Sequence, residues 1–310
     1  MGGRRWPIAF VAALLLALAP SQALALTPCT ATRPATRTLL SGQGRLESAI
    51  VASRGRLFFT NETQLLRLDR PGAAPRVLVD GVDGPGGLVQ APDGSLLMGR
   101  GNNTQDGLVG DFTGPAGILR VNPDTGATSV YATGLAMANG VARAPDGSLY
   151  ATNDLGSNVD RVAPDGTTQA GWSHVLSGNG DAVDTTGRWL YVNQTFQPAA
   201  VKRVDILHPD QVTTYVAPTD PIDLKAGLDG MTRDARDDLF LAANGAGQIW
   251  KATPGPPPRL CLLVGGLAPF PSGPSAVAIG LGHSPFPARN LYVVTFGGDV
   301  IEVPGVVPAR

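Results

Sequence analysis

The amino-acid sequence predicts an all-β fold, a six-bladed β-propeller with four antiparallel strands in each blade. Forty Gly and 27 Pro among 310 residues indicate many turns between short elements. Six segments repeat one pattern, and they begin 39 to 53 residues apart, a spacing that suits four short strands per repeat. A hydrophobic content of 43% excludes a disordered chain. We expect residues 26–310 to form a single propeller domain.

Each repeat starts with one residue at a fixed position, here called the slot, and continues through a strand, a tight turn and a second, apolar strand. The turn reads Pro-Asp-Gly at residues 92–94 and 145–147, which predicts a structural turn rather than a carboxylate site. These two strands are expected to be the innermost of each blade. The six slots hold Glu47, Gly86, Asn139, Asn179, Asp229 and Ser275.

The first 25 residues have the features of a signal peptide. Arg4 and Arg5 form a positive start, residues 8–18 form an apolar run too short to span a bilayer, and residues 23–25 read Ala-Leu-Ala, a small-x-small cleavage pattern. We expect cleavage after Ala25 and a secreted or periplasmic protein. The Arg pair leaves twin-arginine export open as the less favoured route.

The chain is nearly neutral, with 24 basic and 25 acidic residues and a formal net charge of −1. This balance supplies no summed positive field that would attract nucleic acid or an anionic membrane. After the signal peptide, no stretch approaches the ~18 apolar residues of a membrane-spanning helix. We therefore expect a small-molecule substrate, no nucleic-acid partner, no membrane span and a monomer.

The last repeat lacks its outer strand, because only three strands are expected after Ser275. Residues 36–41 near the N-terminus can supply the missing strand and close the ring. This closure brings Cys29 close to Cys261, which belongs to the expected outer strand of blade five. An even pair of cysteines in an exported protein predicts a disulfide.

The slots bring oxygen-bearing side chains together, because equivalent positions of all blades face the central axis. Two carboxylates and two amides suit Ca²⁺, which accepts six to eight oxygen ligands. Zn²⁺ is disfavoured because no His or Cys joins the set. The alternative is that Asn-Gly and Asp-Gly pairs only form turns ahead of the inner strand. Glu47 has no such turn role, which favours the metal site.

The slots and the loops between the second and third strands of each blade open on the same face, because antiparallel strands alternate in direction. We expect these loops to form a substrate pocket. Its predicted lining residues are Asn153, Gln194, Phe196, Asn244 and Phe296.

The longest of these loops, residues 100–117 in blade two, is rich in Gly and Asn. This composition predicts a mobile lid over the pocket rather than a packed element. A passive surface excursion is the alternative.

Five segments carry a family resemblance: Glu47, Asn139-Gly-Val, Asn179-Gly-Asp-Ala-Val-Asp, Asp229-Gly-Met-Thr-Arg-Asp and Pro274-Ser-Ala-Val-Ala. In order and spacing, over about residues 42–305, they resemble the superfamily of senescence marker protein (regucalcin), gluconolactonases and luciferin-regenerating enzyme. The resemblance implies a six-bladed propeller with a divalent metal, usually Ca²⁺, at the top of the central tunnel. The ligands that it implies are Glu47, Asn139, Asn179 and Asp229.

Sugar-lactone members of that superfamily often carry an Arg two residues before the first Asn. This chain has Met137 there, which weighs against a sugar-acid lactone as the substrate.

Together these features predict a secreted Ca²⁺-dependent hydrolase of lactones or esters, in which Asp229 activates water or attacks directly. His174, His208 and His283 are rival bases, but one falls on an expected outer strand and the others in Pro-flanked loops, which favours surface or packing roles. Two alternatives stay open. One is a non-catalytic, metal-stabilised propeller that binds a ligand or a protein. The other is a lyase or synthase similar to strictosidine synthase.

Overall fold

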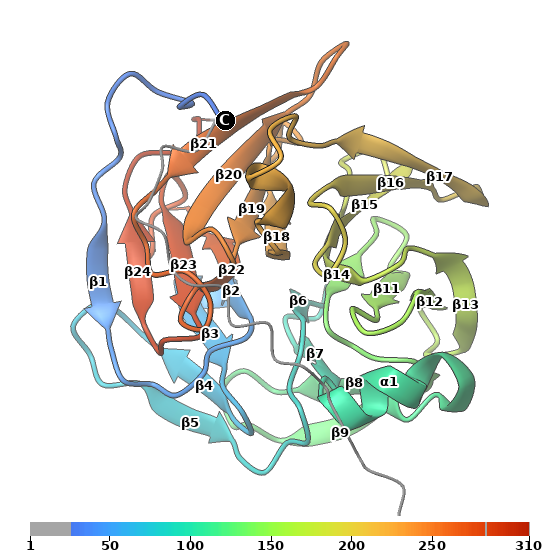
Figure 1. Cartoon of the computed structure of the whole chain (residues 1–310). Helices are drawn as coiled ribbons and strands as arrows, with labels where there is room; N and C mark the ends of the chain where they lie inside the picture. Colours follow the sequence, from blue (N-terminus) through green and yellow to red (C-terminus); the bar gives the residue numbers. More distant parts are fainter. Residues whose placement is uncertain (1–25, 283, 310) are drawn as a thin grey trace, which may run out of the picture.

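The computed structural model describes residues 26–282 and 284–309, which form six four-stranded antiparallel sheets around a central axis (Figure 1). The prediction of a six-bladed propeller with four strands per blade is confirmed. The expected signal peptide, residues 1–25, and His283 lie outside the described residues.

Blades one to five each use four consecutive strands, as expected for hairpin-connected antiparallel sheets. Blades one to three contain β2 (Ala49–Ala52), β3 (Arg56–Thr60), β4 (Leu65–Leu68), β5 (Arg76–Val79), β6 (Leu88–Gln90), β7 (Leu96–Arg100), β8 (Ala116–Val121), β9 (Thr128–Leu135), β10 (Val141–Arg143), β11 (Leu149–Thr152), β12 (Asn158–Val162) and β13 (Thr168–His174). Blades four to six contain β14 (Gly178–Val183), β15 (Trp189–Gln194), β16 (Val201–Asp205), β17 (His208–Val216), β18 (Leu228–Arg233), β19 (Leu239–Ala243), β20 (Gln248–Thr253), β21 (Arg259–Val264), β22 (Pro274–Ile279), β23 (Leu291–Thr295), β24 (Val300–Val303) and β1 (Arg37–Leu40).

The ring is closed by the N-terminal strand, as predicted. β1 pairs antiparallel with β24, and Arg37 lies opposite Glu302 in the register. The two side chains also form an ion pair, with Arg37 Nη2 2.5 Å from Glu302 Oε2. Figure 1 shows β1 along the outer edge of blade six, from which the chain continues into blade one.

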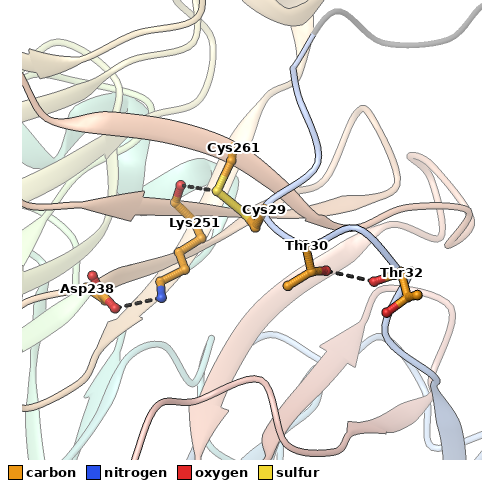
Figure 2. The surroundings of a disulfide bond; sticks show 6 residues. All are labelled: Cys29, Thr30, Thr32, Asp238, Lys251 and Cys261. Atoms are coloured by element: carbon orange, nitrogen blue, oxygen red, sulfur yellow. Dashed lines mark hydrogen bonds and ion pairs between the residues drawn. A yellow bond between two sulfur atoms is a disulfide. The ribbon is translucent and has the colours of Figure 1, made fainter.

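The predicted disulfide between Cys29 and Cys261 is confirmed, with the two Cα atoms 5.1 Å apart (Figure 2). The segment that carries Cys29 runs beside β21, because the Cys29 N–H donates to the Leu262 carbonyl and the Leu262 N–H donates to the Thr27 carbonyl. A structural disulfide indicates that the protein functions in an oxidising compartment.

The hydrophobic core of the described residues divides into six clusters, one between each pair of neighbouring blades. Alternation along the strands produces this arrangement. In β3, Leu57 and Phe59 pack toward blade six, whereas Phe58 packs toward blade two. Each blade is thus held by apolar contacts on both of its faces.

The long loop of blade two is a packed helix, so the prediction of a mobile lid without a packed element is wrong. Residues Thr104–Thr113 form α1, which begins at the N-cap Asn103 and ends at Gly114 in the left-handed conformation, with φ 57°. A Cβ on Gly110 would lie 1.9 Å from the Ala136 carbonyl oxygen, so this glycine permits close packing against the propeller.

One carboxylate fastens α1 to blade three. Asp111 accepts hydrogen bonds from the Asn153 side chain, from the backbone and hydroxyl of Ser157, and from the Asn158 backbone N–H, at 2.7 to 3.2 Å. Of the helices in the described part of the chain, none is long and apolar enough to cross a bilayer.

Replacing both cysteines, in the variant Cys29→Ser/Cys261→Ser, is expected to lower the free energy of unfolding by about 2 to 5 kcal/mol, because the unfolded chain gains conformational freedom. Urea denaturation of both proteins measures this difference. Dithiothreitol should destabilise the wild type and leave the variant unchanged. Equal unfolding curves for the two proteins would contradict a stabilising bridge.

Asp111→Ala is expected to loosen α1 while the blades remain intact, because it removes the acceptor that joins the helix to blade three. Hydrogen exchange of the amides in residues 104–113 should become about tenfold faster or more. Asp165→Ala is the matched control, since the Asp165 carboxylate bonds only within its own turn. Unchanged exchange in α1 would show that the helix does not depend on Asp111.

Candidate metal and substrate site

The four predicted ligands meet in one place. Glu47, Asn139, Asn179 and Asp229 all line a cavity of about 740 Å³ at one end of the central tunnel, here called the axial cavity. They come from blades one, three, four and five, so the ring closure that joins these blades also assembles the cavity.

Two of the slots lie inside strands. Asn179 belongs to β14 and Asp229 to β18, so these two residues are not turn formers ahead of the inner strand. Asn139 lies at a bend two residues before β10, as the turn alternative expects for that slot. The glycine after each slot has a different role. A Cβ on Gly180 would lie 2.5 Å from the Cα of Gly230, because the inner strands crowd together at the axis.

The two amide side chains are free to bind a ligand. Asn139 is 9% exposed and Asn179 is 3% exposed, and neither side chain makes a hydrogen bond to another described residue. Their backbones are fixed, since the Thr152 hydroxyl donates to the Asn179 carbonyl at 2.6 Å and the Asn139 N–H donates to the Thr152 carbonyl at 3.2 Å. Their polar atoms reach the axial cavity and are not sealed in the packed core, so they are available to a ligand.

The two carboxylates are each oriented by one amide. Asn244 donates to Asp229 Oδ2 and Asn102 donates to Glu47 Oε1, both at 3.1 Å. The Asn193 side chain donates to the Asp229 backbone carbonyl at 2.6 Å and so holds β18, the strand that carries Asp229, in position.

Asp154 lines the axial cavity, as do Glu62 and Asp83, and none of these three carboxylates was among the predicted site residues. The Asp154 Oδ1 atom is buried and has no hydrogen-bond partner among the described residues. Burial, together with the negative charge of Glu47, raises the pKa of Asp154 to about 7. The available sequence signal was its position two residues after the end of β11, in a loop on the slot face.

The carboxylates of Glu47, Asp154 and Asp229 also perturb one another. Burial is the main cause that raises the pKa of Asp229 well above its usual range, and the charges of Glu47 and Asp154 raise it further. Burial likewise raises the pKa of Glu47, although the Asn102 hydrogen bond opposes the shift. A bound cation would lower these pKa values, because a nearby opposite charge favours the ionised carboxylates.

The donor set fits Ca²⁺. It is all oxygen, and none of the described His or Cys residues lines the axial cavity. Within residues 26–282 and 284–309 no three His, Cys, Asp or Glu side chains are grouped as metal ligands would be. The predicted set contains only two such residues, because its other two members are amides.

The remaining slots have structural roles. At Gly86 a Cβ would lie 1.9 Å from the Ala138 carbonyl oxygen, so no side chain fits there. Ser275 donates its hydroxyl to the Leu46 carbonyl at 2.7 Å.

The predicted pocket residues divide into two groups. Phe196, Asn244 and Phe296 line the axial cavity. Asn153 and Gln194 do not, because their side chains donate to the backbone carbonyls of Gly107 and Leu176 and stabilise α1 and a neighbouring loop.

The described histidines lie away from the axial cavity. His174 ends β13 and His208 begins β17, and both are exposed on the outermost strands of their blades, as expected for His174.

No family model matches the chain, and no curated protein matches it. Solved structures share its fold at low sequence identity. A calcium-binding protein, regucalcin from Agrobacterium tumefaciens, is 17% identical with a TM-score of 0.69, covering 93% of this chain and 98% of its own. A gluconolactonase from Xanthomonas campestris is 15% identical with a TM-score of 0.69, covering 92% and 99%. A luciferin-regenerating enzyme is 15% identical with a TM-score of 0.64, covering 88% and 96%.

These neighbours confirm, at the level of the fold, the resemblance that the sequence suggests. A virginiamycin B lyase from Staphylococcus aureus also shares the fold, with a TM-score of 0.58. The fold therefore does not assign an activity by itself.

The metal-free protein is expected to lose stability as the pH rises from about 4 to about 7, because the pKa of Asp154 is higher in the folded state than in the unfolded chain. Ionisation of Asp154 then favours unfolding by up to about 4 kcal/mol. Asp154→Asn should remove this part of the pH dependence. Urea denaturation in EDTA at several pH values measures it, and parallel pH profiles for the two proteins would contradict the assignment.

Proposed function

We propose that this protein is an exported Ca²⁺-dependent hydrolase of lactone or ester substrates. The observation that carries the proposal is the pair of amides, Asn139 and Asn179, whose side chains make no hydrogen bond to another described residue and share the axial cavity with the carboxylates of Glu47 and Asp229. Such a set of oxygen donors suits a hard divalent cation. The gluconolactonase and calcium-binding neighbours support the same reading.

Glu47, Asn139, Asn179 and Asp229 would hold the ion. When bound, Ca²⁺ supplies a Lewis acid that can polarise a substrate carbonyl. Asn244 donates to one oxygen of Asp229, and no described residue donates to the other, which can activate water or attack the carbonyl. Asp154 is a rival base, since its carboxylate lines the same cavity and its Oδ1 atom has no hydrogen-bond partner among the described residues.

The site also has room for an organic substrate. Met137, Leu155, Phe196 and Phe270 give the axial cavity apolar walls, which can bind the non-reacting part of a substrate and limit the access of water. A ligand-binding propeller without catalysis is the main alternative, and the same cavity would serve it.

Removal of Ca²⁺ by EDTA is expected to lower the melting temperature, and Ca²⁺ added at about 100 times its Kd should restore about 2.7 kcal/mol of stability. Turnover of a panel of lactones and esters should require the ion. Unchanged melting and unchanged turnover of protein shown to be metal-free would exclude the proposal. Ca²⁺ binding without turnover of any substrate would favour the non-catalytic alternative.

Asp229→Asn is expected to preserve the fold, weaken Ca²⁺ binding and lower kcat by about 100-fold or more, because the catalytic carboxylate is lost. Asp234→Asn is the matched control. Asp234 follows the same strand, lines the opposite end of the tunnel, and accepts its two backbone hydrogen bonds through one oxygen that Asn retains. Full activity in Asp229→Asn would exclude the base role, and Asp154→Asn then tests the rival.

A further inference from the structure

Arg45 is a cation in the wall of the axial cavity that the proposed metal chemistry does not use. Its guanidinium lies over the Phe296 ring, with Cζ 3.8 Å from the ring centroid. Leu46, the next residue, is buried in the core between blades one and six, so the chain holds Arg45 and Glu47 on the cavity side. The stacked ring orients the guanidinium plane, and its N–H edges stay available.

The guanidinium has no ionic or hydrogen-bond partner of its own among the described residues. The Glu62 carboxylate accepts a hydrogen bond from the Arg45 backbone N–H at 2.8 Å, not from the Arg45 side chain. The guanidinium is near enough to the carboxylates of Glu47 and Asp229 to lower their pKa values, but it forms no ion pair with either of them.

These observations indicate which chemical group could bind beside Arg45 in the axial cavity. A planar guanidinium with free N–H groups matches a carboxylate, which can accept two parallel hydrogen bonds. The apolar side chains of Met137, Leu155, Phe196 and Phe270 line other parts of the axial cavity, among polar residues, and suit a hydrocarbon or aromatic body.

We infer that Arg45, stacked on Phe296, binds a carboxylate of the substrate, and that the substrate is a carboxylate-bearing lactone or ester with an apolar body. The inference depends on the proposed function only for the identity of the reacting group, a lactone or an ester. Recognition of the carboxylate depends on Arg45 and can be measured without turnover.

The test compares two probes of equal shape, 3-phenylpropionate and 3-phenylpropionamide, by isothermal titration calorimetry in buffer with Ca²⁺. The wild type should bind the carboxylate at least about tenfold more tightly than the amide. Arg45→Gln should abolish this preference, and Arg45→Lys should retain part of it because it keeps the charge without the planar fork. Lys225→Gln is the matched control, since Lys225 is the other cation that lines the axial cavity.

Equal binding of the carboxylate by wild type and Arg45→Gln would overturn the inference, and so would the absence of any preference in the wild type. Carboxylate binding that persists in Arg45→Gln but disappears with EDTA would assign the probe to the metal instead. A matched pair of esters, with and without a remote carboxylate, adds a kinetic readout in which Arg45→Gln raises KM for the charged ester alone. Failure of the wild type to hydrolyse any ester would reject the proposed function, while the calorimetry still decides the role of Arg45.

Discussion

The antiparallel pairing of β1 with β24 joins the N-terminal segment to the last blade, and the chain then passes directly into blade one. Two further backbone hydrogen bonds, from the Leu46 N–H to the Thr295 carbonyl and from the Gln43 N–H to the Gly298 carbonyl, hold the segment before blade one against blade six. Leu57, Phe59 and Tyr292, all fully buried in the cluster between these blades, would be exposed if the ring opened at this junction. The disulfide at Cys29 anchors the same segment to blade five, so covalent and hydrogen-bonded constraints act on one junction.

Closure also determines the chemistry at the axis. Six inner strands brought together around one line leave little room, and Gly180 and Gly230 allow the neighbouring backbones to approach. The side chains just before these glycines point into the axial cavity, where Asn179 and Asp229 join residues from other blades. The requirement for close strand packing and the requirement for a polar site are therefore met by adjacent residues.

The axial cavity concentrates polar groups that the protein does not satisfy internally. Carboxylates whose pKa values are raised by burial reduce the stability of the metal-free protein, because the folded state disfavours their ionised form. Such a cost is characteristic of functional sites, where binding energy from a ligand offsets it. Arg45 gives the wall a positive group beside this negative centre, so one cavity presents separate positions for a cation and for an anion.

The sequence by itself determined the number of blades, the strand that closes them, the cysteine pair and the four slot residues that meet in the axial cavity. These features follow from local patterns, since repeat spacing and strand alternation are written in consecutive residues. Only the tertiary structure decided three others. Residues 104–113 are glycine-rich and become helical because Ala136 and Asp111 contacts stabilise them. Asp154 and the Arg45–Phe296 pair depend on where loops from different blades meet, and no local pattern specifies contacts between segments so distant in the chain.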